Sequence, residues 1–336
     1  MKKNVCLGSK KDGNPYAGTV EEGISFDTYE VTCRRLKQYD SITNPIIMGP
    51  YELISRSLVD HAKIKEGDSV LDLGSGTGIT TLEILLQNPK ANVIGVEQSK
   101  GMLEVANYKF HKNYGKKLLE CTNDPALIKY WNEFREKSKV HKDNVEFLLN
   151  DFEEVELETQ SIDYAIGGSF MHWTNLGNSF KQLKLFLKPK GKVLWSTTSH
   201  FYNDSEFPAS EYGFRYNDFL AHVMDEVKKK IGKNNVKDYR NIARPKHDLE
   251  SIQKISLGNG LKTEKIGTRV IHVDLQTFVQ THVPVFVKEL IIPDMDESVS
   301  QKIVNESIAS VINNPSALKD IKHKYDIIPI FESKKD

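Results

Sequence analysis

The chain of 336 residues has little cysteine: only Cys6, Cys33 and Cys121, which lie far apart in the sequence. An odd, widely spaced set of this kind forms neither a disulfide framework nor a cysteine-based metal cluster, so we expect reduced thiols in a cytoplasmic protein. The chain also lacks net charge, because 46 basic side chains balance 46 acidic ones. No overall field therefore draws it to nucleic acid or to an acidic lipid surface.

Long apolar runs are absent as well. No segment approaches the ~20 apolar residues that span a bilayer, and residues 1–9 are basic without the apolar core of a signal peptide. We therefore expect a soluble protein without a membrane partner. The ten histidines show no paired spacing typical of a metal site, so no bound metal is expected.

Short apolar segments alternate with helical patterns along much of the chain. This alternation predicts βαβ units, and hence a Rossmann-like α/β fold with a mostly parallel sheet and helices on both faces. The segments predicted to be strands are 70–73, 92–96, 145–149, 162–166, 193–198, 265–273 and 327–331.

Composition divides the chain further. Residues 115–143 are highly charged and are predicted to be an insertion before the third strand. A stretch that is first aromatic and then basic, with a predicted helix at 217–231, interrupts the pattern later on. We expect an N-terminal extension (1–35), a Rossmann-like core (36–199), an inserted helical lid over the substrate site (200–262) and a C-terminal part completing the sheet (263–336).

The most informative motif spans residues 70–78 and reads Val-Leu-Asp-Leu-Gly-Ser-Gly-Thr-Gly. A strand that enters a glycine turn before a helix lets the backbone approach a ligand closely, because no Cβ atom stands in the way. A dinucleotide fingerprint would need a third glycine where Ile79 stands. The observed spacing fits a ligand without pyrophosphate, whose cationic amino-acid tail Asp72 can hold directly or through water.

Two more acids follow predicted strands. Glu97 ends the second strand, where a carboxylate can accept hydrogen bonds from both hydroxyls of a ribose, a contact that NAD enzymes also use. The alternative is a surface glutamate at the end of a strand. Asp151 follows the third strand, where it can accept the adenine amino group while Phe152 packs on the ring. Alternatively, Asp151 caps the next turn.

These motifs resemble, in order and spacing, those of class I S-adenosylmethionine (SAM)-dependent methyltransferases, and best the type 11 group of small-molecule enzymes. The likeness covers about residues 35–200 and implies a seven-stranded sheet whose last strand, near 325–331, is antiparallel. It implies SAM as the cofactor. A tyrosine over the cofactor is assigned to Tyr39, with Tyr29 and Tyr51 as rivals. The resemblance implies these cofactor-binding residues: Tyr39, Asp72, Gly74, Ser75, Gly76, Thr77, Gly78, Glu97, Gln98, Met102, Asn150, Asp151, Phe152, Gly168 and Ser169.

The segment 162–173 is where this fold exposes reacting groups, and His172 and Trp173 are the predicted catalytic residues. The segment lacks the Asn/Asp-Pro-Pro-aromatic run expected of enzymes that methylate nucleic-acid or protein amides. It resembles enzymes that methylate small carboxylates and acyl groups, such as trans-aconitate, malonyl-carrier-protein and juvenile-hormone-acid methyltransferases. A carboxylate needs no general base, since it is already ionised. His172 would hydrogen-bond the acceptor, act as base toward an amine or hydroxyl, or form a structural corner with Trp173.

The sequence thus predicts a SAM-dependent methyltransferase whose partner is a small-molecule acceptor, a carboxylate or an amine. In the lid, Arg215 and Arg244 can pair with a substrate carboxylate or be solvated, and the lysines at 228–230 are interpreted as a solvated helix face. Two other hypotheses remain open. One is a SAM-binding protein or cyclase-like enzyme without methyl transfer, and the other is methylation of RNA or protein.

Overall fold

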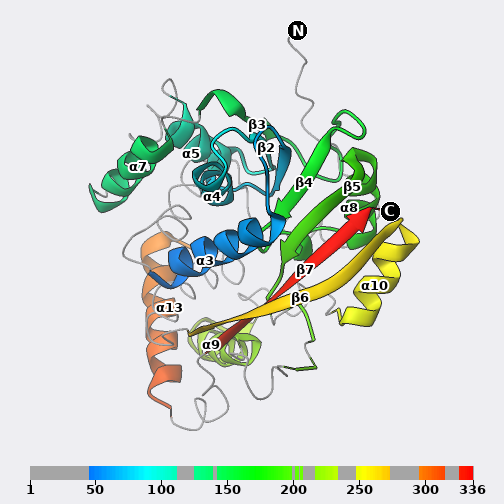
Figure 1. Cartoon of the computed structure of the whole chain (residues 1–336). Helices are drawn as coiled ribbons and strands as arrows, with labels where there is room; N and C mark the ends of the chain where they lie inside the picture. The colour runs from blue at the N-terminus through cyan, green and yellow to red at the C-terminus, as the bar shows by residue number, and fades with distance from the viewer. Residues whose placement is uncertain are drawn as a thin grey trace.

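One sheet of seven strands organises the molecule (Figure 1). The computed structural model describes residues 45–111, 125–138, 142–198, 201–203, 205–206, 216–233, 247–272, 295–314 and 325–335. The strands run in the order β3-β2-β1-β4-β5-β7-β6. Their bounds are β1 Ser69–Leu73, β2 Asn92–Glu97, β3 Val145–Leu149, β4 Ile162–Gly167, β5 Leu187–Ser196, β6 Leu261–His272 and β7 Tyr325–Lys335.

The pairing confirms the predicted fold class. Strands β1 to β5 pair in parallel, whereas β7 lies antiparallel between β5 and β6. The antiparallel strand predicted near 325–331 is β7. In a parallel sheet the carboxyl ends meet at one edge, which is where open α/β sheets bind their ligands.

Helices cover both faces of the sheet, as predicted (Figure 1). On one face, α3 and α4 lie beside a core that includes Leu58, Leu85 and Ile166. On the other, α8 and α10 pack on a second core with Phe180 and Ile252. The helices are α3 Pro45–Ala62, α4 Ile79–Gln87, α5 Lys100–Phe110, α7 Pro125–Ser138, α8 Leu176–Phe186, α9 Tyr216–Ile231, α10 Leu249–Gly258 and α13 Glu297–Ile312.

Most strand bounds follow the prediction closely, because the central strands are buried on both faces and therefore read as continuous apolar runs. Strand β5 differs, since it begins at Leu187 and not at 193. Its register with β4 jumps from Ile162–Leu187 to Tyr164–Lys192. Residues 188–191 thus form an irregularity within β5, with Lys190 in a left-handed conformation (φ 65°).

Two helices from separate parts of the chain form a pair that we call the cap. The predicted helix at 217–231 is confirmed as α9, and it packs against α13, which lies between β6 and β7 in sequence. In Figure 1 both lie on the side of the sheet toward which β4 and β5 point. Their partnership brings together residues from within and beyond the predicted lid (200–262). Helix α10, also within that range, instead packs against β6 and α8.

Some predictions lie outside the described residues. These concern Tyr39, its rival Tyr29, Arg215 and Arg244. Within the described ranges, no helix combines the length and apolar character that crossing a bilayer requires.

Candidate functional site

The glycine loop joins β1 to α4 by a tight turn, and its geometry explains the glycines. Gly74, Gly76 and Gly78 have φ angles of 61°, 53° and 87°, a region that L side chains seldom adopt. The Gly78 N–H donates to the Ser75 carbonyl at 2.8 Å, which closes the turn. A Cβ atom on Gly78 would meet the Phe110 ring at 2.9 Å, so α5 also requires a glycine there.

Asp72 lies beneath this loop and is 1% exposed. Its Oδ2 accepts a hydrogen bond from Thr81 Oγ1 at 2.6 Å, and the Thr81 backbone N–H donates to it as well. Burial raises the pKa of the Asp72 carboxyl to about 7; the Thr81 hydrogen bonds oppose this rise, and the charge of Glu97 adds to it. The carboxyl is therefore held at the first turn of α4, and its contact with a ligand ammonium stays a prediction.

Glu97, at the end of β2, reaches across to the glycine loop. Its Oε2 accepts the Gly76 N–H at 3.0 Å, and its Oε1 accepts the Ser99 N–H at 2.7 Å. Burial raises the pKa of the Glu97 carboxyl, whereas the backbone N–H groups lower it. The structure thus brings together two motifs that the sequence singled out separately. Each carboxylate oxygen keeps further acceptor capacity, so ribose hydroxyls can bind there too.

The third predicted motif, at the end of β3, adjoins the same edge. The Asn150 N–H donates to the Glu97 carbonyl at 3.1 Å. Asp151 Oδ1 accepts the Glu153 N–H at 2.9 Å, so this side chain does cap the next turn. Phe152 is 2% exposed and packs within the core. The capping alternative is therefore observed, while the adenine contacts of Asp151 and Phe152 stay predictions.

Two predicted residues follow β2 more loosely. Gln98 is exposed and Met102 is half-buried on α5. Ser99 lies between them in sequence and caps α5, since its side chain accepts the Met102 N–H. Their proximity to a sugar and a base stays a prediction.

Phe170 is a site residue that the sequence reasoning missed. Its ring lies against Gly74, so a Cβ atom added to that glycine would fall 2.2 Å from the Phe170 ring. The same ring meets Phe152 edge-on, with centroids 5.7 Å apart. Phe170 thus connects the end of β4 to the glycine loop. Because 96 positions separate it from Gly74, only the order of the strands would have revealed this contact.

The ends of β4 and β5 form the other half of the site. Ser169 has a left-handed φ of 57°, and its N–H donates to Ser196 Oγ at 3.1 Å. Gly168 lies close to α4, since a Cβ atom there would be 3.6 Å from Thr80 Oγ1. Backbone in sparsely populated conformations is often found at functional sites.

His172 follows directly, with three groups around its ring. Its Nδ1 is 3.1 Å from Thr197 Oγ1, and its ring stacks on Phe201 with centroids 4.2 Å apart and an interplanar angle of 12°. Trp173 is tilted against the same imidazole and is 43% exposed. Thr197 was not singled out from the sequence, and Phe201 was noted only as one of the aromatic residues at the start of the predicted lid. Thr197 lies within the predicted strand 193–198 and Phe201 just after it, but their contact with His172 depends on the pairing of β5 with β4, which the sequence did not predict.

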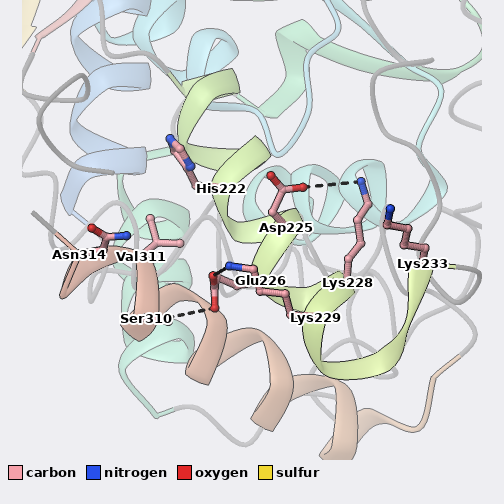
Figure 2. Close-up of a pocket in the computed structure, with 9 residues that line it drawn as sticks. All are labelled: His222, Asp225, Glu226, Lys228, Lys229, Lys233, Ser310, Val311 and Asn314. Carbon is pink, nitrogen blue, oxygen red and sulfur yellow. Dashed lines mark hydrogen bonds and ion pairs between the residues drawn. The ribbon is translucent and has the colours of Figure 1, made fainter. Parts of the chain in front are cut away.

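A cavity of about 360 Å³ lies apart from these residues, between α9 and α13 (Figure 2). Its lining is strongly polar and includes Asp225, Glu226 and three lysines. The two acids are engaged, since Asp225 pairs with Lys228 at 4.0 Å and Glu226 with Lys229 at 2.5 Å. None of the predicted cofactor or catalytic residues lines this cavity, so it belongs to the cap and not to the glycine-loop site.

Comparison with known proteins points to one family. A family model described as "Methyltransferase domain" matches residues 64–119. A malonyl-[acyl-carrier protein] O-methyltransferase of Priestia megaterium is 30% identical over 38% of this chain and 36% of its own length. The same-named protein of Acetivibrio thermocellus is 25% identical over 59% and 68%. A demethylmenaquinone methyltransferase of Lactobacillus johnsonii is 29% identical over 30% and 42%.

The matched part is limited in extent. It spans less than half the length of two of these three relatives, and the family model covers β1, β2 and their helices. The part of the chain that the family model matches includes the glycine loop and Glu97.

Proposed function

We propose that this chain, a class I SAM-dependent methyltransferase by its family match, its relatives and its strand order, transfers a methyl group to a small molecule. The observation that carries the proposal is the hydrogen bond between Glu97 and the Gly76 N–H at the carboxyl edge of the sheet. This hydrogen bond brings the glycine loop and the acid at the end of β2 together, and SAM would need both.

The residues present fit SAM. The backbone over Gly76 is open, because the nearest atom to an added Cβ is the Gly74 carbonyl oxygen at 3.9 Å. Ser75 Oγ is buried and has no hydrogen-bond partner among the described residues. The raised pKa values of Asp72 and Glu97 show that both carboxyls resist ionisation in this environment, which a ligand with positive sulfonium and ammonium groups would relieve.

SAM supplies an activated methyl group that leaves its sulfonium with the bonding pair remaining on sulfur. The residues of the chain itself position the cofactor and the acceptor and shield them from water. The Glu97 carboxyl would accept hydrogen bonds from the ribose hydroxyls, and the glycine loop would let the cofactor approach the backbone closely. At the ends of β4 and β5, Ser169 and His172 face the acceptor, with the imidazole held by Thr197 and Phe201. For an ionised acceptor no proton has to be removed. The rate enhancement then comes from aligning the acceptor oxygen with the methyl group and its sulfur, and from excluding water.

The same residues and the named relatives support one class of acceptor. A carboxylate oxygen is a nucleophile without loss of a proton, and neutral hydroxyl and imidazole N–H groups can orient it by hydrogen bonds. Two relatives are named for an acyl-carrier-protein malonyl group, which carries a free carboxylate. We therefore favour a small carboxylate or carboxyl-bearing acyl group, with an amine as the second arm of the test.

The test uses SAM labelled in its methyl group and the full chain. Malonyl thioester, small di- and tricarboxylates and small amines serve as acceptors, and S-adenosylhomocysteine release is measured. The product class follows from alkali treatment, because a methyl ester releases volatile methanol whereas an N-methyl product does not. Label transferred into base-labile product supports the proposal; SAM binding without turnover on either acceptor class contradicts it.

Variants assign the roles. Glu97→Gln keeps the size of the side chain but removes its charge, and it should raise KM for SAM. His172→Gln keeps one hydrogen-bonding group in place of the imidazole. It should lower kcat by roughly 10-fold while KM for SAM stays unchanged, if the imidazole positions the acceptor. Equal effects of the two variants on SAM binding would show that His172 belongs to the cofactor site instead.

A further inference from the structure

Lys109 is a cation that the proposed reaction does not use, and it is fully buried at the last turn of α5. Its Nζ donates to the Thr77 carbonyl at 3.0 Å. Thr77 lies inside the glycine loop, so a positive charge from α5 is attached directly to the backbone that the cofactor would contact. A buried ammonium is costly unless such partners hold it.

Helix α7 supplies the other side of this arrangement. The Lys109 Nζ lies 4.3 Å from the centroid of the Phe134 ring and 5.6 Å from that of Tyr130. A cation over an aromatic face is stabilised by the ring's quadrupole, most strongly when it is desolvated. Ser138 Oγ also donates to the Lys109 carbonyl. Helix α7 thus holds Lys109 at both its ammonium and its backbone.

The packing of α7 on α5 is extensive around this point. Tyr108 meets Trp131 edge-on with centroids 6.0 Å apart, and its hydroxyl donates to Asn132 at 2.9 Å. Phe110 meets Phe134 with centroids 5.7 Å apart, and the Phe110 ring occupies the space beside Gly78. Two neighbouring residues of α5 therefore connect α7 to the glycine loop, Lys109 through its ammonium and Phe110 through its ring.

We propose that Lys109 is a positioning residue for the cofactor loop, and that α7 is the element that holds it in place. Only the expected effect on SAM affinity rests on the proposed function; the effect on the loop itself does not. With the ammonium bound to the Thr77 carbonyl, the turn is held before any ligand arrives. Without the ammonium, the loop gains alternative conformations. The affinity for SAM then falls in proportion to the fraction of molecules whose loop keeps the binding conformation. The segment 125–138 therefore contributes to cofactor affinity without touching the cofactor.

The experiment compares Lys109→Met with the wild-type full chain. Methionine keeps most of the apolar stem and removes the charge. Hydrogen exchange is followed at the amides of residues 74–80 in the ligand-free protein, and SAM affinity is measured by calorimetry at a temperature where circular dichroism shows both proteins folded. We expect loop protection and SAM affinity each to fall roughly 10- to 100-fold, the effect of losing one hydrogen bond to a charged group. Exchange in β4 and β5 should stay unchanged.

Matched variants separate positioning from general destabilisation. Phe134→Leu keeps Lys109 and removes the ring beneath it, so a smaller loss at residues 74–80 is expected, and Phe134→Tyr should restore it. Lys129→Met removes a lysine of α7 that is 74% exposed and should change neither readout. If Lys109→Met is not folded, the Phe134 pair still decides the question.

The outcomes are distinct. Wild-type protection of residues 74–80 in folded Lys109→Met overturns the positioning role. A second outcome is that the wild type binds no SAM, while residues 74–80 lose protection in Lys109→Met. This result would support the positioning role of Lys109 and contradict the proposed function.

Discussion

Two regions of the molecule, the cofactor half of the site and the cap, are built differently. The glycine loop, Asp72 and Glu97 fall within residues 69–110, and their carboxylates are held by backbone N–H groups and a hydroxyl. The cap combines α9 with α13, which is about 80 residues further along the chain. Both helices bury apolar side chains, such as Val223 and Ile308, and an exposed ion pair joins them. The predicted cofactor contacts are thus fixed within one short stretch of the chain, whereas the cap depends on segments that lie far apart in the sequence.

The largest expected effect concerns the cofactor half of the site, where Asp72 should make the stability of the protein depend on pH. Because its pKa is raised to about 7, the folded chain keeps this proton while the unfolded chain loses it near pH 4. Between these pH values the folded state binds more protons, so the free energy of unfolding falls as pH rises, by up to roughly 4 kcal/mol for this group. Asp72→Asn removes the dependence. The measurement is urea unfolding of both proteins at intervals from pH 4 to pH 8.

The variant and the wild type should therefore diverge with pH, and Asp72→Asn should gain relative stability toward pH 8. Parallel curves would contradict the assigned pKa. Saturating SAM should reduce the wild-type dependence, since a nearby ammonium favours the ionised carboxyl.

The second largest effect is expected at Gly76, and a comparison with Gly67 separates the cost of backbone strain from the loss of cofactor access. Gly76 and Gly67 both have left-handed φ angles, 53° and 82°, and neither would place a Cβ within 3.4 Å of other atoms. Alanine at either position should cost roughly 1–2 kcal/mol of stability. Only Gly76→Ala should also weaken SAM binding, by about 100-fold or roughly 2.7 kcal/mol, because its methyl group enters the cofactor face. Thermal unfolding and calorimetry measure the two quantities. Equal SAM affinity in both variants would exclude Gly76 from the site.

The smallest effect is expected in the cap. The Lys230 Nζ and Glu306 Oε2 are 3.0 Å apart, with side chains 33% and 47% exposed. A double-mutant cycle of Lys230→Met and Glu306→Gln should yield a coupling energy of about 0.2–1 kcal/mol, which high salt diminishes. A coupling well above this range would show that α9 and α13 are joined by charge and not by their apolar faces.

The sequence predicted the cofactor half better than the cap, for physical reasons. The strand before Asp72 and the glycine loop follow from local pattern, since apolar runs and glycines constrain the backbone where they stand. The contact of Glu97 with Gly76 depends on strands that are neighbours in both sequence and space. By contrast, Phe170 against Gly74 and Thr197 against His172 require the order of β1, β4 and β5.

The capping role of Asp151 shows a different limit. The sequence allowed both a cap and an adenine contact, and the structure shows the cap without excluding the other. Lys109 shows a third limit. It shares one helical stripe with Met102 and Val105, where a lysine is unexpected, and this was the only signal in the sequence that it is buried.

The most direct test of the central claim is calorimetric titration of SAM into the wild-type chain and into Glu97→Gln. Saturable binding to the wild type, weakened by roughly 10- to 100-fold in the variant, is predicted because the ribose hydroxyls lose a charged acceptor. Absence of binding to a folded wild-type chain, or equal affinity in the two proteins, would contradict the assignment of the glycine loop and Glu97 as the cofactor site.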